Sequence, residues 1–289
     1  MAILDSFPQV EVTIEVNGQP LQEHRESDLI VDRPRRTLRY VEASNDDIFE
    51  IVLTVKKGAV FRGECIAFDV HVDGDYIGGP IFWKGSCDDE DTSQVEDGRI
   101  GPRNTVQEFK FSGLDITDAD RTLPKEDERL IGVGTILVTF QDCRRVREVK
   151  ETLQSKKKRK LDTVSEKAVK GRALSHSIEY AASEPRADEA VKIYKTRPVD
   201  PQEEENGIEF RYRSLASLRA LHIIPMPLSL EERDVTTLST AEVAELQRRV
   251  RDNAEWEERA LKIKRERGSP GLTVRVGDRE VELVDLTED

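Results

Sequence analysis

Apolar and polar residues alternate in several short stretches of the first half of the chain. Residues 10–16 read VEVTIEV, and an apolar side chain at every second position is typical of a half-buried β-strand. Further stretches with strand character are 37–43, 49–56, 66–72, 76–83, 106–111 and 135–141. Asn17-Gly18 and Asp73-Gly74 follow two of these stretches and predict tight hairpin turns. Because no stretch with a helical period separates the strands, the pattern predicts a mainly β fold, an antiparallel, jelly-roll-like β-sandwich.

Strand and helix signals return in the second half. Residues 191–196 and 208–213 read as two strands separated by the acidic loop PVDPQEEENG, and Ser214 can cap a short helix reaching about His222. Ser239 and Glu242 form a capping box for a longer charged helix, which should end near Arg267 before Gly-Ser-Pro. The apolar stripe of that helix is thin, so we expect it to be exposed. Residues 148–162 suit a helix and a linker equally well.

These signals divide the chain into five parts. We expect a sandwich over 1–146, a basic loop or linker over 147–190, a strand pair with a short helix docking back on the sandwich over 191–228, a charged exposed helix over 229–270 and a flexible acidic tail over 271–289. Charged residues make up 36% of the chain and hydrophobic residues 37%, which is too polar for one compact unit. The C-terminal extension is therefore expected to be partly helical and partly disordered.

The net charge of −13 is unevenly distributed. Residues 144–172 contain twelve Lys or Arg against four Asp or Glu, so this stretch carries about +8 and the remainder about −21. A basic island in an acidic chain indicates a local contact patch or address rather than a general polyanion-binding surface.

The cysteines indicate a reducing compartment. Cys65, Cys87 and Cys143 are odd in number and widely spaced, which argues against a disulfide framework. Cys65 and Cys143 fall within strand patterns and are expected in the core. No apolar run is long enough to span a membrane, and the first residues lack the basic and apolar regions of a signal peptide, so we expect neither a membrane protein nor a secreted one.

Catalytic and metal-binding patterns are weak. Asp69, His71 and Asp73 alternate along one strand and share a face, but the apolar residues between them supply the buried face, so this triad is expected to point to water. No zinc spacing and no G-x-S-x-G motif is present. We therefore expect no enzyme, no metal and no cofactor.

The closing residues carry the strongest functional signal. The aliphatic positions Val281, Leu283, Val284 and Leu286 are interspersed with acidic residues that include Asp285, Glu288 and Asp289. This run resembles a SUMO-interacting motif, which adds as a strand to an exposed sheet edge of its partner. The alternative is structural, because residues 272–276 and 279–284 can pair as a hairpin through Gly277-Asp278.

A basic run indicates nuclear import. Lys156, Lys157, Lys158, Arg159 and Lys160 resemble a monopartite nuclear localisation signal, which binds an import receptor. The same run can contact nucleic-acid phosphates, but no aromatic residue interleaves with it to stack on bases.

Two further segments have weaker signals. Lys264 stands in the tetrapeptide IKRE, which resembles a SUMO-acceptor site, and the alternative is a plain surface charge on the helix. Residues 165–176, SEKAVKGRALSH, follow the basic run, and we expect them to dock between the linker and the sandwich.

Stretches spread over most of the chain resemble one known family. They are EVTIEVNGQPL from Glu11, YVEA from Tyr40, FDVHVDG from Phe68, EFKF from Glu108, GTI from Gly134, SEKAVKGRALSH from Ser165, FRYRS from Phe210, ALHIIP from Ala220 and the closing VDLTED. They are similar to a fungal family defined only as a domain of unknown function. The resemblance implies a β-sandwich with charged C-terminal extensions and brings no catalytic residues.

Together these features predict a non-enzymatic nuclear protein that binds SUMO or sumoylated partners through its tail. A nucleic-acid or chromatin-associated protein using residues 144–172 is the first alternative. An enzyme whose site is assembled only in three dimensions is the second.

Overall fold

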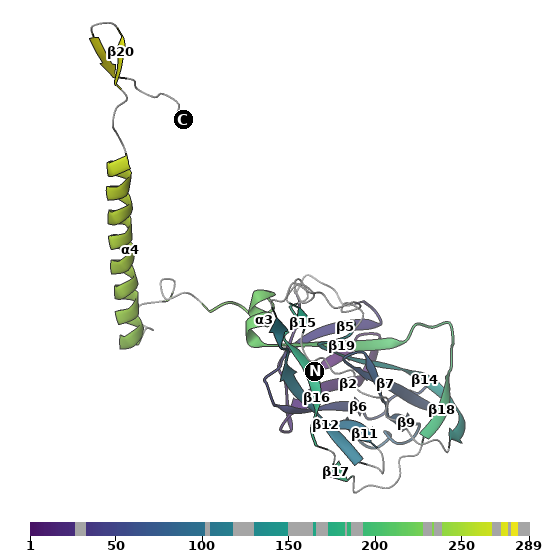
Figure 1. The fold of residues 1–289 in the computed structure, drawn as a ribbon. Helices are drawn as coiled ribbons and strands as arrows, with labels where there is room; N and C mark the ends of the chain where they lie inside the picture. Colours follow the sequence, from purple (N-terminus) through teal and green to yellow (C-terminus); the bar gives the residue numbers. More distant parts are fainter. Residues whose placement is uncertain are drawn as a thin grey trace. The chain divides into compact units, whose positions relative to one another are not determined.

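The structure is a computed structural model that describes residues 1–26, 33–101, 105–117, 130–149, 164–165, 173–182, 184–185, 193–227, 233, 239–267, 273–276 and 279–282. The chain divides into two compact units, Met1–Pro225 and Met226–Asp289. The first unit is a body of β-strands, and the second contains a long helix and a hairpin (Figure 1).

In the described part of the body, one sheet contains nine strands, all of them paired antiparallel. Its central path runs β1 (Ala2–Leu4), β2 (Phe7–Val16), β6 (Ile48–Val55), β12 (Thr105–Gly113) and β11 (Gly98–Gly101). Four strands attach to this path, namely β3 (Gln19–Pro20), β10 (Thr92–Glu96), β16 (His176–Tyr180) and β17 (Glu184–Pro185).

The second sheet has eight strands among the described residues and is mixed. Its path runs β4 (Glu23–His24), β5 (Arg36–Glu42), β19 (Asn206–Arg213), β14 (Thr135–Val149), β7 (Cys65–Val72) and β8 (Asp75–Gly78). β18 (Ile193–Pro198) also pairs with β14, and β9 (Ile81–Trp83) pairs with β7. β5 and β19 are parallel, whereas the other pairs are antiparallel. A separate parallel pair joins β13 (Ile116–Thr117) to β15 (Val164–Ser165).

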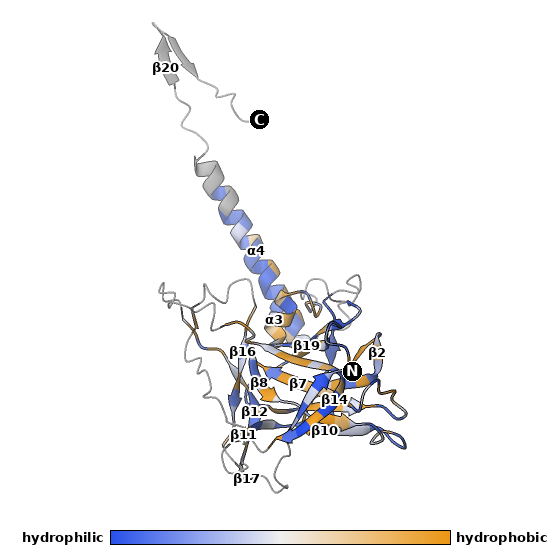
Figure 2. Ribbon diagram, turned by 90° about the vertical axis from the view of Figure 1, so that its right-hand side faces the viewer, coloured by the Kyte–Doolittle hydropathy of each residue, from blue (hydrophilic) through white to orange (hydrophobic). Residues whose placement is uncertain are grey.

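The core lies between the two sheets because alternate residues of each strand point inward. In β6 the buried residues are Phe49, Ile51, Leu53 and Val55, and β7 contributes Ile66, Phe68, Val70 and Val72 to the same cluster. Each side chain of this size stabilises the fold by roughly 1.5–3 kcal/mol when fully buried. The strands of the body accordingly carry most of the apolar colour in Figure 2. The predicted mainly β sandwich is confirmed, with the parallel β5–β19 pair as a departure from a wholly antiparallel arrangement.

Both hairpin turns predicted by sequence are present. Asn17 and Gly18 join β2 to β3 with φ values of 53° and 71°, and Asp73 and Gly74 join β7 to β8 with 52° and 79°. Two successive left-handed residues define the turn whose twist matches paired strands, and Asn, Asp and Gly tolerate that conformation best.

A serine caps the N-terminus of each of the two helices predicted from the sequence. Ser214 accepts a hydrogen bond from the Ser217 backbone N–H at 3.2 Å and caps α3 (Leu215–Ala220) in the body. In the second unit Ser239 and Glu242 bond reciprocally, at 2.8 Å and 3.3 Å, at the start of α4 (Thr240–Arg267). The predicted capping box and helix end are thus confirmed.

The surface of α4 is polar, as its colour in Figure 2 shows. From Gln247 to Arg259 all described side chains are exposed, including Val250 and Trp256 at 62% and 71%. Glu245 forms ion pairs with Arg248 and Arg249, which support an exposed helix. β20 (Thr273–Val276) and β21 (Arg279–Glu282) then pair as an antiparallel hairpin.

Candidate functional site

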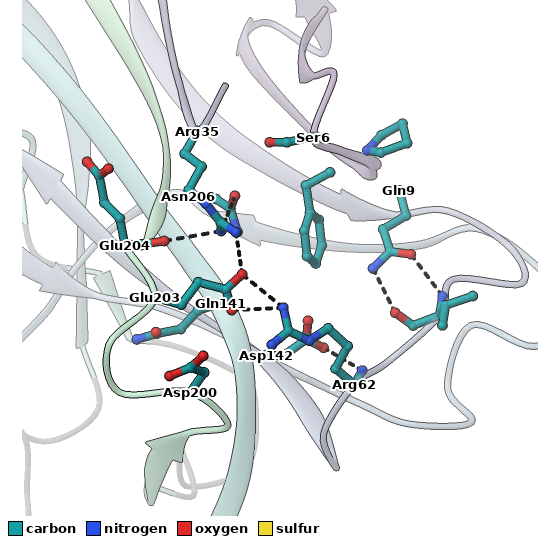
Figure 3. A pocket seen from close by; sticks show the side chains of 13 residues that line it. Ser6, Gln9, Arg35, Arg62, Gln141, Asp142, Asp200, Glu203, Glu204 and Asn206 are labelled. Carbon is teal, nitrogen blue, oxygen red and sulfur yellow. Dashed lines mark hydrogen bonds and ion pairs between the residues drawn. The ribbon is translucent and has the colours of Figure 1, made fainter. Parts of the chain in front are cut away.

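A pocket of about 240 Å³ opens where loops of the body meet the start of β2 and the middle of β14 (Figure 3). Phe7 and Gln9 come from β2, and Asp142 comes from β14. Arg62 lies between β6 and β7, and Glu203 lies between β18 and β19. Segments distant in sequence therefore converge on one polar concavity.

Two arginines hold the Glu203 carboxylate in this pocket. Arg62 Nη1 donates to both Glu203 oxygens, at 2.9 Å and 2.8 Å, and Arg35 Nη2 forms a second ion pair with it. Arg35 Nη1 also donates to the Glu204 carbonyl oxygen at 3.2 Å. Hydrogen bonds and charge from Arg62, then Arg35, lower the pKa of Glu203. The acidic loop 199–205 is thereby fastened to the body.

Asp142 fixes the opposite wall of the pocket. Its carboxylate accepts a hydrogen bond from the Arg62 backbone N–H at 2.9 Å, and the side chain is 8% exposed. Burial raises the pKa of Asp142, and the hydrogen bond from Arg62 opposes that rise. These charged groups form hydrogen bonds and ion pairs with one another. We therefore interpret the pocket as a contact that holds the loop 199–205 on the body, and not as a ligand-binding site.

Asp73 occupies a partly buried polar position, which differs from the sequence expectation that it faces water. Its carboxylate accepts hydrogen bonds from Gly134 N at 2.9 Å, from Ile178 N at 2.8 Å and from the Tyr212 hydroxyl. The left-handed turn directs the side chain inward, where these donors come from β16, β19 and the start of β14. Asp73 therefore joins both sheets instead of forming a metal triad with Asp69 and His71.

The segment before β16 packs into a small cluster of its own. Val164 and Leu174 are 1% and 5% exposed and pack with Leu130 and Val133. Ser175 Oγ lies 2.9 Å from His176 Nδ1 and accepts a hydrogen bond from Ser214 N at 2.7 Å. Leu174, Ser175 and His176, which close residues 165–176, thus contact the body, and residues 166–172 lie outside the described part.

Burial governs the titrating groups beside this segment. His176 is 6% exposed, and desolvation, followed by the charge of Arg213, lowers its pKa. Arg213 is itself 4% exposed and donates to the carbonyl oxygens of Gly134 and Tyr212 at 2.7 Å and 2.8 Å. Burial lowers the pKa of Arg213 as well.

A basic two-stranded ribbon forms where β18 pairs with the second half of β14. Five exposed basic residues lie on it, namely Arg144, Arg145, Arg147, Lys195 and Arg197. Arg145 lies over the rings of Tyr194 and Trp83, at 4.9 Å and 5.6 Å from their centroids. The sequence showed no aromatic residue among the basic ones, because β9 and β18 supply these rings from distant parts of the chain.

Most sequence-predicted site residues lie outside the described residues. This applies to Lys156–Lys160 and to Leu283, Val284, Asp285, Leu286, Glu288 and Asp289. Val281 is described and lies in β21 opposite Val274, as the hairpin alternative requires. Lys264 lies in α4. Cys65 and Cys143 are 0% and 1% exposed, so their predicted core positions are confirmed.

The described part of the chain contains neither a cluster of metal ligands nor a helix that could span a membrane. Its His, Cys, Asp and Glu side chains include no group of three or more placed to hold a metal ion. None of its helices has both the length and the apolar character needed to cross a bilayer.

Most of the body matches a known protein family. Residues 9–227 match the family model described as domain of unknown function DUF7918. The match covers more than half of the chain, so the protein belongs to this family, and the resemblance found in the sequence is confirmed at that level. A search of curated proteins and a search of solved structures gave no match.

Proposed function

We propose that the protein is a non-enzymatic nuclear interaction module that binds SUMO or sumoylated partners through Val281–Asp289. The observation that carries the proposal is the tail sequence, an aliphatic run set among acidic residues. β-strand addition uses backbone hydrogen bonds for affinity and alternate side chains for selectivity. Acidic residues beside the run, such as Asp285 and Glu288, complement a basic groove.

The hairpin in the second unit is compatible with this mode of binding. β21 pairs with β20 along one edge, with Thr273 opposite Glu282 and Val276 opposite Arg279. A two-stranded hairpin is marginally stable in water and gains from a third strand. The second edge of β21 can accept the edge strand of a partner, so the hairpin and partner binding need not exclude each other.

The peptide 279–289 tests the proposal directly. Titration into isotope-labelled SUMO should shift resonances along one sheet edge, with a dissociation constant on the order of micromolar, about 8 kcal/mol. So few backbone hydrogen bonds, opposed by the entropy of ordering the peptide, give weak binding. Amide replacements at Asp285, Glu288 and Asp289 should weaken binding less than alanine at Val284 and Leu286, and that loss should shrink in high salt.

Nuclear localisation is part of the proposal and rests on Lys156–Lys160. Neutralising these five residues in a bulky fusion should move it to the cytoplasm, because import receptors bind clustered basic side chains. The bulk matters because a chain of 32.9 kDa is small enough to diffuse through nuclear pores. Unchanged nuclear accumulation of the neutralised fusion would overturn this part. Modification of Lys264 remains a proposal that a Lys264→Arg variant tests in a conjugation assay.

The basic ribbon favours nucleic-acid binding as a second candidate function. β18 places Lys195 and Arg197 beside the arginines of β14, and Trp83 and Tyr194 add aromatic rings. Five neutralised phosphates would give a slope of about −3.5 in log affinity against log salt on single strands. A shallow slope, or one unchanged when the ribbon residues are replaced by glutamine, would remove this candidate.

A further inference from the structure

The outer face of the second sheet contains a pocket that the proposed function does not use. It has a volume of about 240 Å³, and Asp69 of β7, Thr139 and Gln141 of β14 and Glu205 line it. These strand residues alternate with the core residues Phe68, Val70, Val138 and Phe140, so their side chains point away from the core. This cavity is called the outer-face pocket below.

The outer-face pocket presents two carboxylates without an ion-pair partner among the described residues. Asp69 accepts a hydrogen bond from the Tyr76 hydroxyl, and Glu205 Oε1 accepts one from Gln141 Nε2 at 3.2 Å. Asp69 has an exposed side chain, yet neighbouring atoms desolvate its carboxyl group and raise its pKa, and the charge of Glu205 adds to the rise. The two negative charges therefore oppose each other.

Thr139 provides an independent sign that the pocket is built to hold a ligand. The residue is 7% exposed and lines the pocket, and its hydroxyl is not among the fully buried, unpaired polar atoms of the described residues. The hydroxyl therefore faces the open pocket, where a group that enters can hydrogen-bond with it.

Aromatic side chains stand beside these acceptors. Tyr76 and Tyr194 both line the pocket, and Tyr76 is 53% exposed. Tyr194 already has the Arg145 guanidinium 4.9 Å from its ring centroid on the adjoining ribbon. Aromatic faces attract cations through their quadrupole. His71 lies on the same strand as Asp69 and would compete for its carboxylate.

We propose that the outer-face pocket binds the ammonium or guanidinium group of a basic side chain from a protein partner. Such a group donates to Asp69, Glu205 and Thr139 together, relieves the repulsion between the carboxylates and rests against tyrosine rings. The site lies on the body and not on the tail, so it provides a second, separate contact for partners of this interaction module.

The probes are acetyl-Gly-Arg-Gly-amide and its neutral citrulline isostere, titrated into the isotope-labelled full chain. The arginine peptide should shift the amide resonances of Asp69, Thr139 and Gln141 at millimolar concentration, and the citrulline peptide should shift them far less. The double variant Asp69→Asn, Glu205→Gln keeps the hydrogen-bond acceptors, removes both charges and should weaken binding about tenfold.

A matched control removes two carboxylates from the other sheet. Glu15→Gln with Glu50→Gln changes the net charge equally at a cross-strand pair of the first sheet and should leave binding unchanged. Equal shifts from both peptides, or full binding by the Asp69/Glu205 variant, would overturn the proposal. A neutral disaccharide that shifts the same amides while the arginine peptide does not would also overturn it, in favour of a polyhydroxyl ligand.

Discussion

Asp73 joins a hairpin turn to both sheets through one carboxyl group. Its removal leaves two backbone N–H groups and a tyrosine hydroxyl without their acceptor inside the protein. A buried donor left unpaired costs about 1–3 kcal/mol, and hydrogen bonds to charged groups are at the upper end. The integrity of the body therefore depends on a residue whose sequence context indicated only a turn.

We predict that Asp73→Ala lowers the free energy of unfolding by about 3 kcal/mol or more, measured by urea denaturation. Asp75→Ala is the matched control two residues away and should change it by less than about 0.5 kcal/mol. If both variants lost a similar free energy of unfolding, the turn itself, and not the hydrogen bonds of the Asp73 carboxylate, would determine stability here.

His176 makes the stability of the body sensitive to pH. Its pKa in the folded state lies below the ordinary value because burial and Arg213 disfavour the charged ring. Between those two pKa values the unfolded state binds more protons, so stability is present above about pH 6.5 and falls as pH drops towards the folded pKa. The parent should lose more stability than His176→Gln between about pH 7.5 and 5.5. Parallel losses would contradict this assignment. Burial raises the pKa values of Asp142 and Glu23, so these groups change stability with pH in the opposite direction, equally in both proteins.

The thiols should be unreactive in the folded protein. Burial, followed by the neighbouring Cys143, raises the pKa of Cys65 to about 12, and burial also raises the pKa of Cys143. Since the thiolate is the nucleophile, iodoacetamide at about pH 8 should label neither thiol until the protein is unfolded. Rapid labelling of native Cys65, read by mass spectrometry, would contradict the buried position.

At the scale of elements, strand periodicity and local turn chemistry predicted most of the body. Residues 10–16, 49–56 and 66–72 formed strands because alternation depends only on near neighbours. The second half of β14 was not predicted as a strand, because residues 144–149 are exposed and charged. They are extended because β18, about fifty residues further along the chain, pairs with them. The parallel β5–β19 pair depends on an even longer separation.

The same limit explains which parts of the sites escaped sequence reasoning. Glu203 and Arg62 meet across 141 positions, and no local pattern marks either residue as a partner of the other. The outer-face pocket likewise combines Asp69 of β7, Thr139 of β14 and Glu205 of the loop before β19. The tail motif was visible because all of its residues are contiguous.

Glu203 fastens the loop between β18 and β19, but its contribution should be small. The carboxylate is 26% exposed and Arg62 is 49% exposed, so water screens the pair. We predict that Glu203→Gln lowers the free energy of unfolding by about 1 kcal/mol or less in urea denaturation. Glu204→Gln, at a side chain 69% exposed, should have almost no effect. If Glu203→Gln lowered the free energy of unfolding by several kcal/mol, the ion pairs of Glu203 would be essential to the stability of the whole sheet, contrary to this prediction.

At the scale of the molecule, the family match and the first compact unit nearly coincide. The match ends at residue 227 and the unit ends at Pro225, so α4, the hairpin and the tail lie beyond the family domain. The body and the tail can therefore be altered independently. Fold alone does not determine function, and the tail carries the more specific chemical signal.

The most direct test compares the full chain with its Val284→Ala, Leu286→Ala variant in binding to immobilised SUMO. The parent should bind with a dissociation constant on the order of micromolar. The variant should lose detectable binding, because each fully buried aliphatic side chain contributes roughly 1.5–3 kcal/mol. Both proteins should unfold at the same denaturant concentration, since the substitutions lie outside the body. Equal binding by the two chains, or no binding by the parent at millimolar SUMO, would contradict the account.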